Sequence, residues 1–172
     1  MRLFVAIYPP EDARADLRRW LTQRGTGVRL TRVERWHLTL SFLGEVAPER
    51  RPEVEQALDG VRPPGRIRLR MSGGGSFGRR RSAALWAGVD GDLPALREVH
   101  ARVREALKTA DLRYDEQPFT PHLTVAYAAG TEIRAALAEY AGPAWTADEF
   151  VLVHSLHHQG GGYRTLRAWP MA

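Results

Sequence analysis

The residues most able to do chemistry in this chain form one short pattern that occurs twice. It reads His-Leu-Thr-Leu at residues 37–40 and His-Leu-Thr-Val at residues 122–125, once in each half of the 172 residues. Side chains alternate between the two faces of a β-strand, so the His and the Thr of each copy share one face. Two such strands facing each other would place two imidazoles and two hydroxyls around one small volume.

These side chains suit acid–base chemistry on a phosphate. Imidazole titrates nearest neutrality, so one ring can accept a proton from water while the other gives a proton to a departing sugar oxygen. The hydroxyls of Thr39 and Thr124 can donate hydrogen bonds to non-bridging phosphate oxygens. In-line displacement puts the attacking and leaving oxygens on opposite sides of phosphorus, so we expect the reactive nitrogens of His37 and His122 to lie roughly 6–8 Å apart.

We predict neither a metal ion nor another cofactor for this chemistry. Zinc sites use three or four protein ligands, whereas the two motifs supply two histidines. His154, His157 and His158 form a second group, but no carboxylate lies at ligand spacing, so exposed strand histidines are the favoured interpretation. His100 lies among charged residues of a helical segment, which indicates a solvated side chain.

The composition is that of an ordinary globular protein, with 44% hydrophobic and 26% charged residues. The absence of cysteine excludes a disulfide framework and a thiolate metal site. No apolar run reaches the roughly 18 residues that cross a bilayer, and Pro9-Pro10 interrupts the first apolar segment too early for a signal peptide. We therefore expect a cytoplasmic monomer that does not associate with membranes.

The formal charge of +5 comes almost entirely from arginine, because lysine occurs once, at Lys108. A GC-rich genome would produce this bias without any functional cause. Arginine also grips phosphate through its planar fork, so the charge suits an anionic partner without proving one.

The apolar patterning predicts the elements that position the two motifs. Strands are expected over 2–8, 28–43 (one or two strands), 67–71, 84–89, 119–127, 149–157 and 163–169, and helices over 10–23, 48–58, 93–110 and 131–140. Thr131 is the expected N-cap of the last helix, and the Gly- and Arg-rich run 72–82 is expected to be a loop.

This order predicts an α+β fold, because strands and helices alternate while short linkers favour largely antiparallel sheets. Each half of the chain repeats the arrangement, with its motif strand between two helices. We expect a single bilobal domain over residues 1–172, with two pseudo-symmetric lobes. Each lobe has helices on the outer face of its sheet and contributes one motif to an active-site cleft between the lobes.

The paired motifs and their flanks resemble the 2H phosphoesterase superfamily, and within it the RNA 2′,3′-cyclic phosphodiesterases, also called the bacterial and archaeal 2′–5′ RNA ligase family. The resemblance runs nearly end to end and is carried by residues 2–7, 36–44, 77, 85–89, 119–125, 153–156 and 162–166. It implies a bilobal fold and metal-independent hydrolysis of RNA 2′,3′-cyclic phosphate ends to a 2′-phosphate, with 2′–5′ ligation as a second reaction.

The resemblance also implies roles for the motif residues. His37 would be the proton donor to the leaving 3′ oxygen, and His122 the proton acceptor that activates water. Thr39 and Thr124 would hold the phosphate. The two motifs are too alike for spacing to distinguish donor from acceptor.

The sequence departs from the family at Tyr127, where members often carry an arginine. A tyrosine cannot neutralise phosphate, so either another arginine does so or the phosphate is held more loosely. The candidates are Arg79, Arg80 and Arg81 of the Gly- and Arg-rich run, unless that run is a solvated hairpin tip. Arg35 is a further candidate, provided that Trp36 points inward.

Aromatic side chains could also stack on nucleobases of the substrate. Tyr127 and Tyr163 are the candidates because their surroundings are polar or glycine-rich. The apolar neighbours of the remaining aromatic residues near the motifs predict core positions, namely for Phe4, Phe42, Phe77 and Trp86.

Two functions of different classes remain open at this point. One is an enzyme that acts on RNA or an oligonucleotide with a 2′,3′-cyclic phosphate end. The other is an RNA-binding module that keeps the cleft without useful turnover. The intact histidine and threonine of both motifs favour the enzyme.

Overall fold

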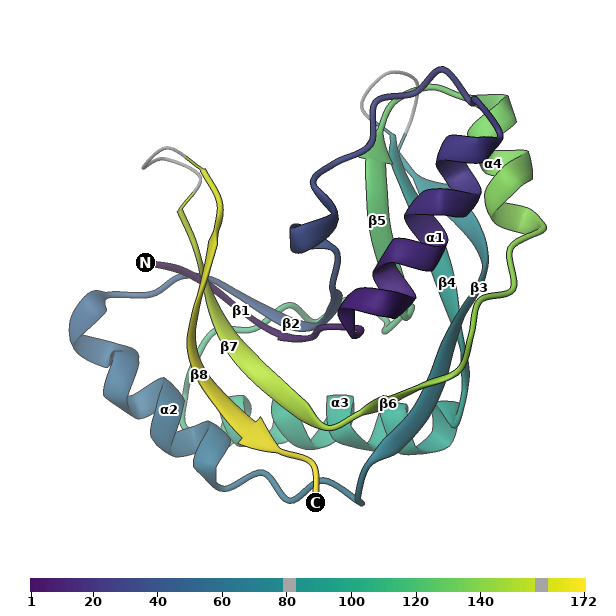
Figure 1. Cartoon of the computed structure of the whole chain (residues 1–172). Helices are drawn as coiled ribbons and strands as arrows, with labels where there is room; N and C mark the ends of the chain where they lie inside the picture. Colours follow the sequence, from purple (N-terminus) through teal and green to yellow (C-terminus); the bar gives the residue numbers. More distant parts are fainter. Residues whose placement is uncertain (79–82, 157–160) are drawn as a thin grey trace.

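Two four-stranded antiparallel sheets form the framework of the molecule (Figure 1). The computed structural model describes residues 1–78, 83–156 and 161–172. The first sheet has the order β2-β1-β7-β8, with β2 Leu38–Glu45, β1 Arg2–Ile7, β7 Glu149–Ser155 and β8 Tyr163–Pro170. The second has the order β5-β4-β3-β6, with β5 His122–Tyr127, β4 Ala84–Gly91, β3 Ile67–Phe77 and β6 Trp145–Ala147. The fold is therefore α+β with two lobes, as predicted, and the motif strands β2 and β5 are edge strands.

The two lobes do not coincide with the two halves of the chain, which corrects the expected repeat by halves. β7 and β8 come from the C-terminal part of the chain but join β1 and β2, while β3 from the first half belongs to the second sheet. The reason lies in β1, which is buried at every residue after Arg2 and pairs with β2 on one edge and β7 on the other. The backbone N–H and C=O groups of a buried strand need hydrogen-bond partners along both edges.

The helices cross between the lobes. α1 (Glu11–Gln23) follows β1 but packs beside α4 (Thr131–Ala138), where the indole of Trp20 donates to the carbonyl of Ala136 at 2.9 Å. α3 (Leu93–Thr109) follows β4 but lies against β2 and against α2 (Arg51–Asp59), as Figure 1 shows. Each lobe is therefore covered in part by a helix that follows a strand of the other lobe.

α1 can bridge the lobes because one side of it is apolar. Ala13, Leu17 and Leu21 are buried at helical spacing, while its arginines remain on the other side. Short 3₁₀ turns precede β2 and α2, as η1 (Val33–Arg35) and η2 (Pro48–Arg50). In the part of the chain that the structure describes, no helix is long and apolar enough to cross a membrane.

The glycine run after residue 72 is a strand, although the sequence predicted a loop. β3 continues through it to Phe77 and pairs Gly74 with Ala87 and Gly75 with Trp86 of β4. A Cβ atom on Gly74 would lie 2.4 Å from the carbonyl oxygen of Trp86, so this approach of the two strands requires glycine. The prediction of strand over residues 28–43 is correct only from Leu38 onward, because residues 28–37 contain η1 and no strand. β6 was missed, and Thr131 is the first residue of α4, with Gly130 as its N-cap. The remaining predicted boundaries shift by a few residues.

His100 is buried, which corrects the expectation of a solvated side chain. It is 7% exposed, and its ring stacks on that of Phe119 with the centroids 4.0 Å apart. Burial, with the charges of Arg104 and Arg97, lowers the pKa of His100 to about 4. The signal was present in the sequence, because His100 shares the helical spacing of the buried Leu96.

Candidate active site

Both histidines of the repeated motif lie at the start of an edge strand, and each is hydrogen-bonded to the backbone carbonyl two residues before it. Nδ1 of His37 donates to the carbonyl of Arg35, and Nδ1 of His122 donates to the carbonyl of Thr120, each at 2.6 Å. A carbonyl oxygen only accepts hydrogen bonds, so Nδ1 of each ring carries a proton. Nε2 is therefore the nitrogen left for proton transfer in both rings.

The segment before the first motif ties the two edge strands together. The N–H and the hydroxyl of Thr31 both donate to the carbonyl of Val125 in β5, at 2.8 and 3.0 Å. The indole of the buried Trp36 donates to the Thr31 hydroxyl at 2.8 Å. The chain that leads into His37 is therefore anchored on the strand that begins with His122.

His37 lies among aromatic rings and is partly shielded from water. Its ring stacks on Phe4 with the centroids 4.7 Å apart, and the ring centroids of Tyr163 and Tyr8 lie 5.4 and 5.5 Å away. Burial lowers the pKa of His37 to about 4, against the opposing effect of the Arg35 carbonyl, and His122 adds to the lowering. The His37 ring is therefore neutral at pH 7 in the free protein and lies within electrostatic range of His122.

The Thr39 hydroxyl completes the surroundings of His37. It lies 3.0 Å from Nε2 of that ring. Because Nδ1 carries the proton of the neutral ring, the hydroxyl donates and Nε2 accepts. The two side chains that the sequence placed on one face of a strand are thus in direct contact.

His122 has aromatic neighbours of its own. The ring of Phe77 meets it edge-on with the centroids 4.9 Å apart, and the Trp86 ring lies 5.6 Å away. Trp86 is the register partner of Thr124. Each imidazole therefore packs against an aromatic residue from the strand next to its motif strand. This residue is Phe4 of β1 for His37 and Trp86 of β4 for His122.

Three of the four aromatic residues predicted for the core lie elsewhere. Phe42 and Phe77 are 45% and 42% exposed, and Trp86 is half-buried beside His122. Phe4 is buried as predicted, but in a small cluster apart from the main core. Apolar composition alone could not reveal this, because two register shifts between β1 and β2 break the strand alternation and turn Phe42 outward.

The predicted substrate-binding residues do not all lie beside the histidine site. Tyr163 begins β8 beside His37, whereas Tyr127 ends β5 and is 62% exposed. Arg79 and Arg81 lie outside the described residues, as does Arg80. Arg35 was a candidate only if Trp36 points inward, and Trp36 is buried. The guanidinium carbon of Arg35 lies 5.8 Å from the centroid of the Tyr163 ring.

The histidine group near the C-terminus is only partly described. His154 lies in β7, while His157 and His158 fall outside the described residues. Among the residues that the structure describes, no cluster of three or more His, Cys, Asp or Glu side chains could hold a metal ion.

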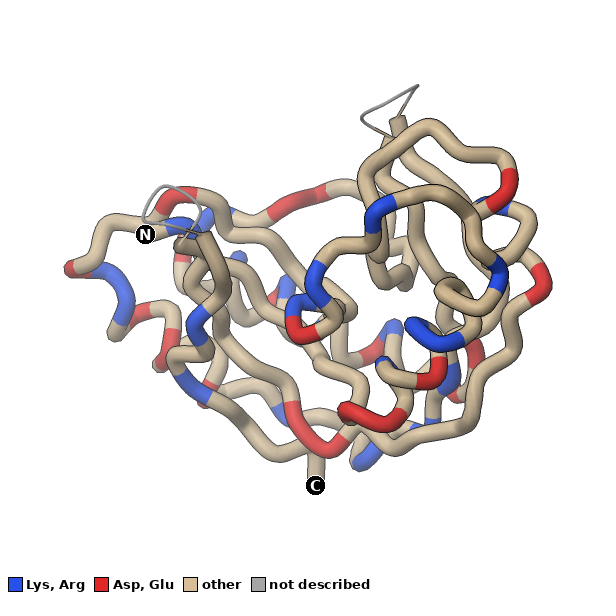
Figure 2. Tube along the Cα trace, turned by 45° about the horizontal axis from the view of Figure 1, so that its top comes forward, with Lys and Arg blue, Asp and Glu red and all other residues tan. Residues whose placement is uncertain are grey.

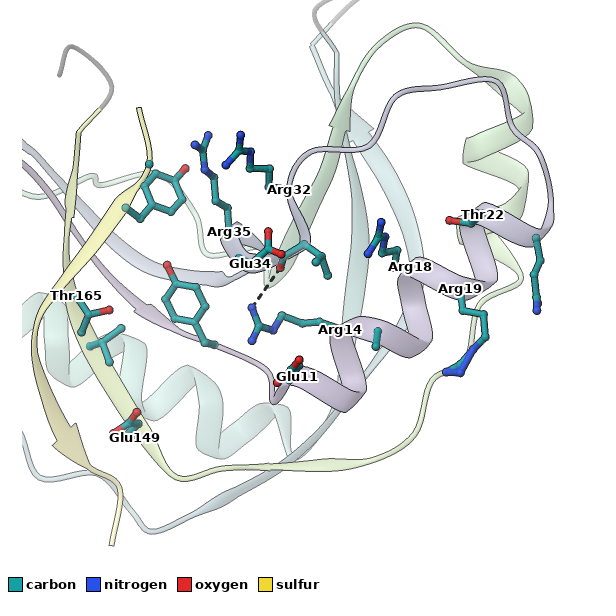
Figure 3. Close-up of a pocket in the computed structure, with 17 residues that line it drawn as sticks. Glu11, Arg14, Arg18, Arg19, Thr22, Arg32, Glu34, Arg35, Glu149 and Thr165 are labelled. Atoms are coloured by element: carbon teal, nitrogen blue, oxygen red, sulfur yellow. Dashed lines mark hydrogen bonds between the residues drawn. The ribbon is translucent and has the colours of Figure 1, made fainter. Parts of the chain in front are cut away.

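A groove of about 1400 Å³ borders the histidine site (Figure 3). It lies between α1, the η1 segment and the strands β7 and β8, and neither motif histidine lines it. Tyr8, Arg35 and Tyr163 line the groove, and both tyrosines also contact His37. The groove is thus an extension of the histidine site that the sequence did not reveal.

Several proteins of known name are similar to this chain in sequence. The RNA 2′,3′-cyclic phosphodiesterase of Thermus thermophilus is 32% identical over 99% of this chain and 90% of that protein. The enzyme of the same name from Archaeoglobus fulgidus is 34% identical over 73% of this chain and 71% of that protein. The chain spans 64% of the Aeropyrum pernix relative and 30% of the Geobacillus stearothermophilus relative that it matches.

Solved structures agree with the fold. TT0787 of Thermus thermophilus superposes with a TM-score of 0.76 at 29% identity, covering 99% of this chain and 98% of that one. LigT of Escherichia coli in its apo form gives a TM-score of 0.82 at 24% identity, covering 98% and 96%. A family model described as the 2′-5′ RNA ligase superfamily matches residues 8–159. The resemblance inferred from the sequence is confirmed, and the chain belongs to the 2′-5′ RNA ligase superfamily.

Proposed function

We propose that this protein is an RNA 2′,3′-cyclic phosphodiesterase that opens the cyclic phosphate at an RNA 3′ end to a 2′-phosphate, using two histidines and no metal ion. The observation that carries the proposal is the repeated imidazole geometry. Both rings donate from Nδ1 to a carbonyl at 2.6 Å, which leaves Nε2 of each ring for proton transfer. The names of the curated relatives support the substrate class.

The reaction is a single in-line displacement at phosphorus. Nε2 of His122 accepts a proton from water as the water oxygen bonds to phosphorus. The bond from phosphorus to the 3′ oxygen breaks, and Nε2 of His37 gives its proton to that oxygen. The products are a 2′-phosphomonoester and a free 3′ hydroxyl, and the two imidazoles have exchanged protonation states.

Substrate binding prepares His37 and the threonines for these steps. In the free protein His37 is neutral and accepts a hydrogen bond from Thr39. An anionic phosphate beside the ring raises the pKa of His37, because an opposite charge favours the protonated form. The hydroxyls of Thr39 and Thr124 can then donate to the two non-bridging oxygens and stabilise their charge.

The same chemistry permits ligation when a 5′ hydroxyl takes the place of water. This second reaction forms a 2′–5′ linkage. Water is far more abundant, so ligation requires the two RNA ends to be held together in the site.

Replacement of either histidine tests the proposal. His37→Ala and His122→Ala should each lower kcat at least about a hundredfold, the usual scale for loss of a general acid or base. Thr39→Ala and Thr124→Ala should cost less. Phosphorus NMR of a dinucleotide 2′,3′-cyclic phosphate should show the 2′-phosphate as the product. Lys108→Ala, on α3, is the control for an unrelated substitution.

The leaving group distinguishes the two roles. In a substrate with sulfur in place of the 3′ oxygen, the leaving group is a thiolate, which needs no proton donor. Such a substrate should therefore restore turnover to His37→Ala and not to His122→Ala. Rescue of the other variant would reverse the assignment. Undiminished hydrolysis by the double variant His37→Ala/His122→Ala would refute the proposed function. RNA binding by the native protein without product at any pH would refute it as well.

A further inference from the structure

We infer that the groove beside the histidine site binds the sugar–phosphate backbone of the RNA strand upstream of the cyclic phosphate, through Arg35, Arg32 and Arg18. This inference rests on the proposed function, because it names the residues that hold the rest of the same substrate. It predicts that the protein prefers an oligonucleotide to a cyclic mononucleotide.

The groove continues directly from the histidine site. The rings of Tyr8 and Tyr163 lie 5.5 and 5.4 Å from the His37 ring, and both residues also line the groove. A cyclic phosphate forms the 3′ end of its strand, so the remaining nucleotides must leave the site in the 5′ direction. The groove gives them a surface that adjoins His37.

Arginines reach this groove from two sides. Arg14 and Arg18 lie one turn apart on α1, with Thr22 one turn further, while Arg32 and Arg35 come from the η1 segment opposite (Figure 3). Residues four apart on a helix have their Cβ atoms about 5–6 Å apart. That spacing is comparable with the spacing of neighbouring phosphates along an RNA strand.

Arg18 and Arg32 are available to a ligand, whereas Arg14 has a structural contact. Nη1 of Arg14 donates to the carbonyl of Val33 at 3.2 Å and so ties α1 to η1. Within the described ranges, no hydrogen bond or ion pair involves the guanidinium of Arg18 or Arg32, and both residues are exposed. Two guanidiniums without protein partners beside a phosphate-handling site suit bidentate binding of phosphate.

The charge of the groove is a local feature. Figure 2 shows basic and acidic residues interspersed along the part of the chain that the structure describes. Five arginines and three glutamates line the groove. Figure 3 shows Glu34 beside Arg35, while Glu11 and Glu149 lie on the side of the groove away from Arg32 and Arg35. A polyanion is therefore favoured over the arginine end of the groove.

The tyrosines fit the same ligand. Burial raises the pKa of Tyr8 to about 12 and also raises the pKa of Tyr163, so both side chains stay neutral at physiological pH. A neutral phenol donates a hydrogen bond to a phosphate or ribose oxygen, and its ring can stack on a base. Tyr163 is 40% exposed and can therefore contact the nucleotide next to the cyclic phosphate.

The dependence of kcat/KM on substrate length tests the inference. The substrates are a cyclic mononucleotide and oligonucleotides of increasing length that share its terminal nucleotide. For the native protein, kcat/KM should rise at least about tenfold with length, the scale of one charged hydrogen bond. In the double variant Arg18→Ala/Arg32→Ala, the ratio between long and short substrates should fall at least about tenfold.

The salt dependence of kcat/KM gives a second measure, which reports the number of contacts between arginines and phosphates. Each contact between an arginine and a phosphate of a single strand contributes about −0.7 to the slope of log(kcat/KM) against log[salt]. The double variant should therefore have a slope about 1.4 units less steep with the long substrate. Lys108→Ala removes one positive charge from α3 and should keep both the native length preference and the native slope.

The outcomes separate this inference from the proposed function. Hydrolysis of the mononucleotide with no gain from added nucleotides would overturn the inference alone. A length preference that survives in the double variant would do the same, provided that its thermal unfolding matches the native protein. Failure to hydrolyse any cyclic phosphate would instead remove the proposed function on which the inference rests.

Discussion

Two histidines with the same sequence context acquire different chemistry from their surroundings. Both donate from Nδ1 to a carbonyl, so the local motif fixes the reactive nitrogen in each case. Only the tertiary structure stacks Phe4 on His37 and lowers the pKa of that ring to about 4 through burial. The motif thus fixes the free nitrogen of both rings, and the fold sets the pKa of His37.

The pH dependence of kcat/KM should report the lowered pKa of His37. The proposed mechanism needs one protonated and one neutral imidazole, so the pKa of His37 in the free protein sets one limb of the profile whichever role that ring has. One limb should therefore lie near pH 4, well below the ordinary 6.5 of imidazole, because burial favours the neutral form of His37. The measurement is a pH–rate profile with a cyclic mononucleotide.

Exposure of the His37 ring should move that limb. Tyr163→Ala removes a ring 5.4 Å from His37 and should shift the limb upward toward 6.5, because water then stabilises the protonated form. Tyr127→Ala, at a side chain that is 62% exposed, should leave the position of the limb where it is. A native profile with both limbs above pH 6 would contradict the burial argument.

At the residue scale, the sequence could predict the His and Thr of each motif and could not predict their aromatic neighbours. His37 and Thr39 are recognisable because a polar pair alternates with leucines. Phe77 and Trp86 are apolar residues in apolar strands. Composition cannot distinguish a ring that packs in the core from one that packs against His122. The arginine groove was missed because the sequence does not show that α1 and the η1 segment face each other across it.

At the scale of the elements, helices were predicted more closely than strands, since β6 was missed, residues 28–37 are not a strand, and part of β3 was predicted as a loop. The 3.6-residue spacing of Leu96, Val99, Val103 and Leu107 gave α3 to within a residue. The glycine run of β3 was predicted as a loop because glycine is disfavoured in strands. Its partner strand explains the exception, since β4 approaches so closely that a side chain at Gly74 has no space.

Substitution in this strand tests that explanation. Gly74→Ala should lower the free energy of unfolding by about 1–3 kcal/mol, the range typical of an overpacked site. Its Cβ would lie 2.4 Å from a backbone carbonyl and 2.6 Å from the Cβ of Leu137, neither of which can move freely. Urea denaturation measures the change.

Gly60→Ala provides the matched control for this substitution. A Cβ atom at Gly60 meets only the carbonyl of Ala57, at an ordinary 3.4 Å, so the same change should cost much less there. Equal effects at Gly74 and Gly60 would mean that crowding against β4 does not determine the result, because the loss of glycine flexibility in the unfolded chain is shared by both sites and stabilises the folded protein.

At the scale of the whole molecule, the exchange of helices makes the two lobes interdependent. The Tyr140 hydroxyl, which follows α4, donates to Asp16 of α1 at 2.6 Å, and Trp20 of α1 donates to Ala136. These contacts join residues more than 100 positions apart. Local patterns carry no information about such pairings, which is why the sequence predicted two lobes but assigned them to the two chain halves.

Interdependent lobes should unfold in one transition. Trp145 lies in the second sheet and Trp169 in the first, and both are buried among the five tryptophans of the chain. The fluorescence change that is lost in Trp145→Phe therefore reports the second sheet, and the change that is lost in Trp169→Phe reports the first. The urea transitions of the two variants should each coincide with the transition seen by far-UV circular dichroism. Two separate transitions would show that the lobes are independent.

Removal of one contact between the lobes makes this test specific. Tyr140→Phe deletes the hydrogen bond to Asp16 and should lower the free energy of unfolding by about 1 kcal/mol. Because α1 belongs by sequence to the first lobe and packs on the second, fluorescence from either lobe should report the same loss. Tyr114→Phe is the matched control, since no hydrogen bond of the Tyr114 hydroxyl occurs among the described residues. A shift confined to the second lobe would show that α1 covers that lobe without coupling it to the first.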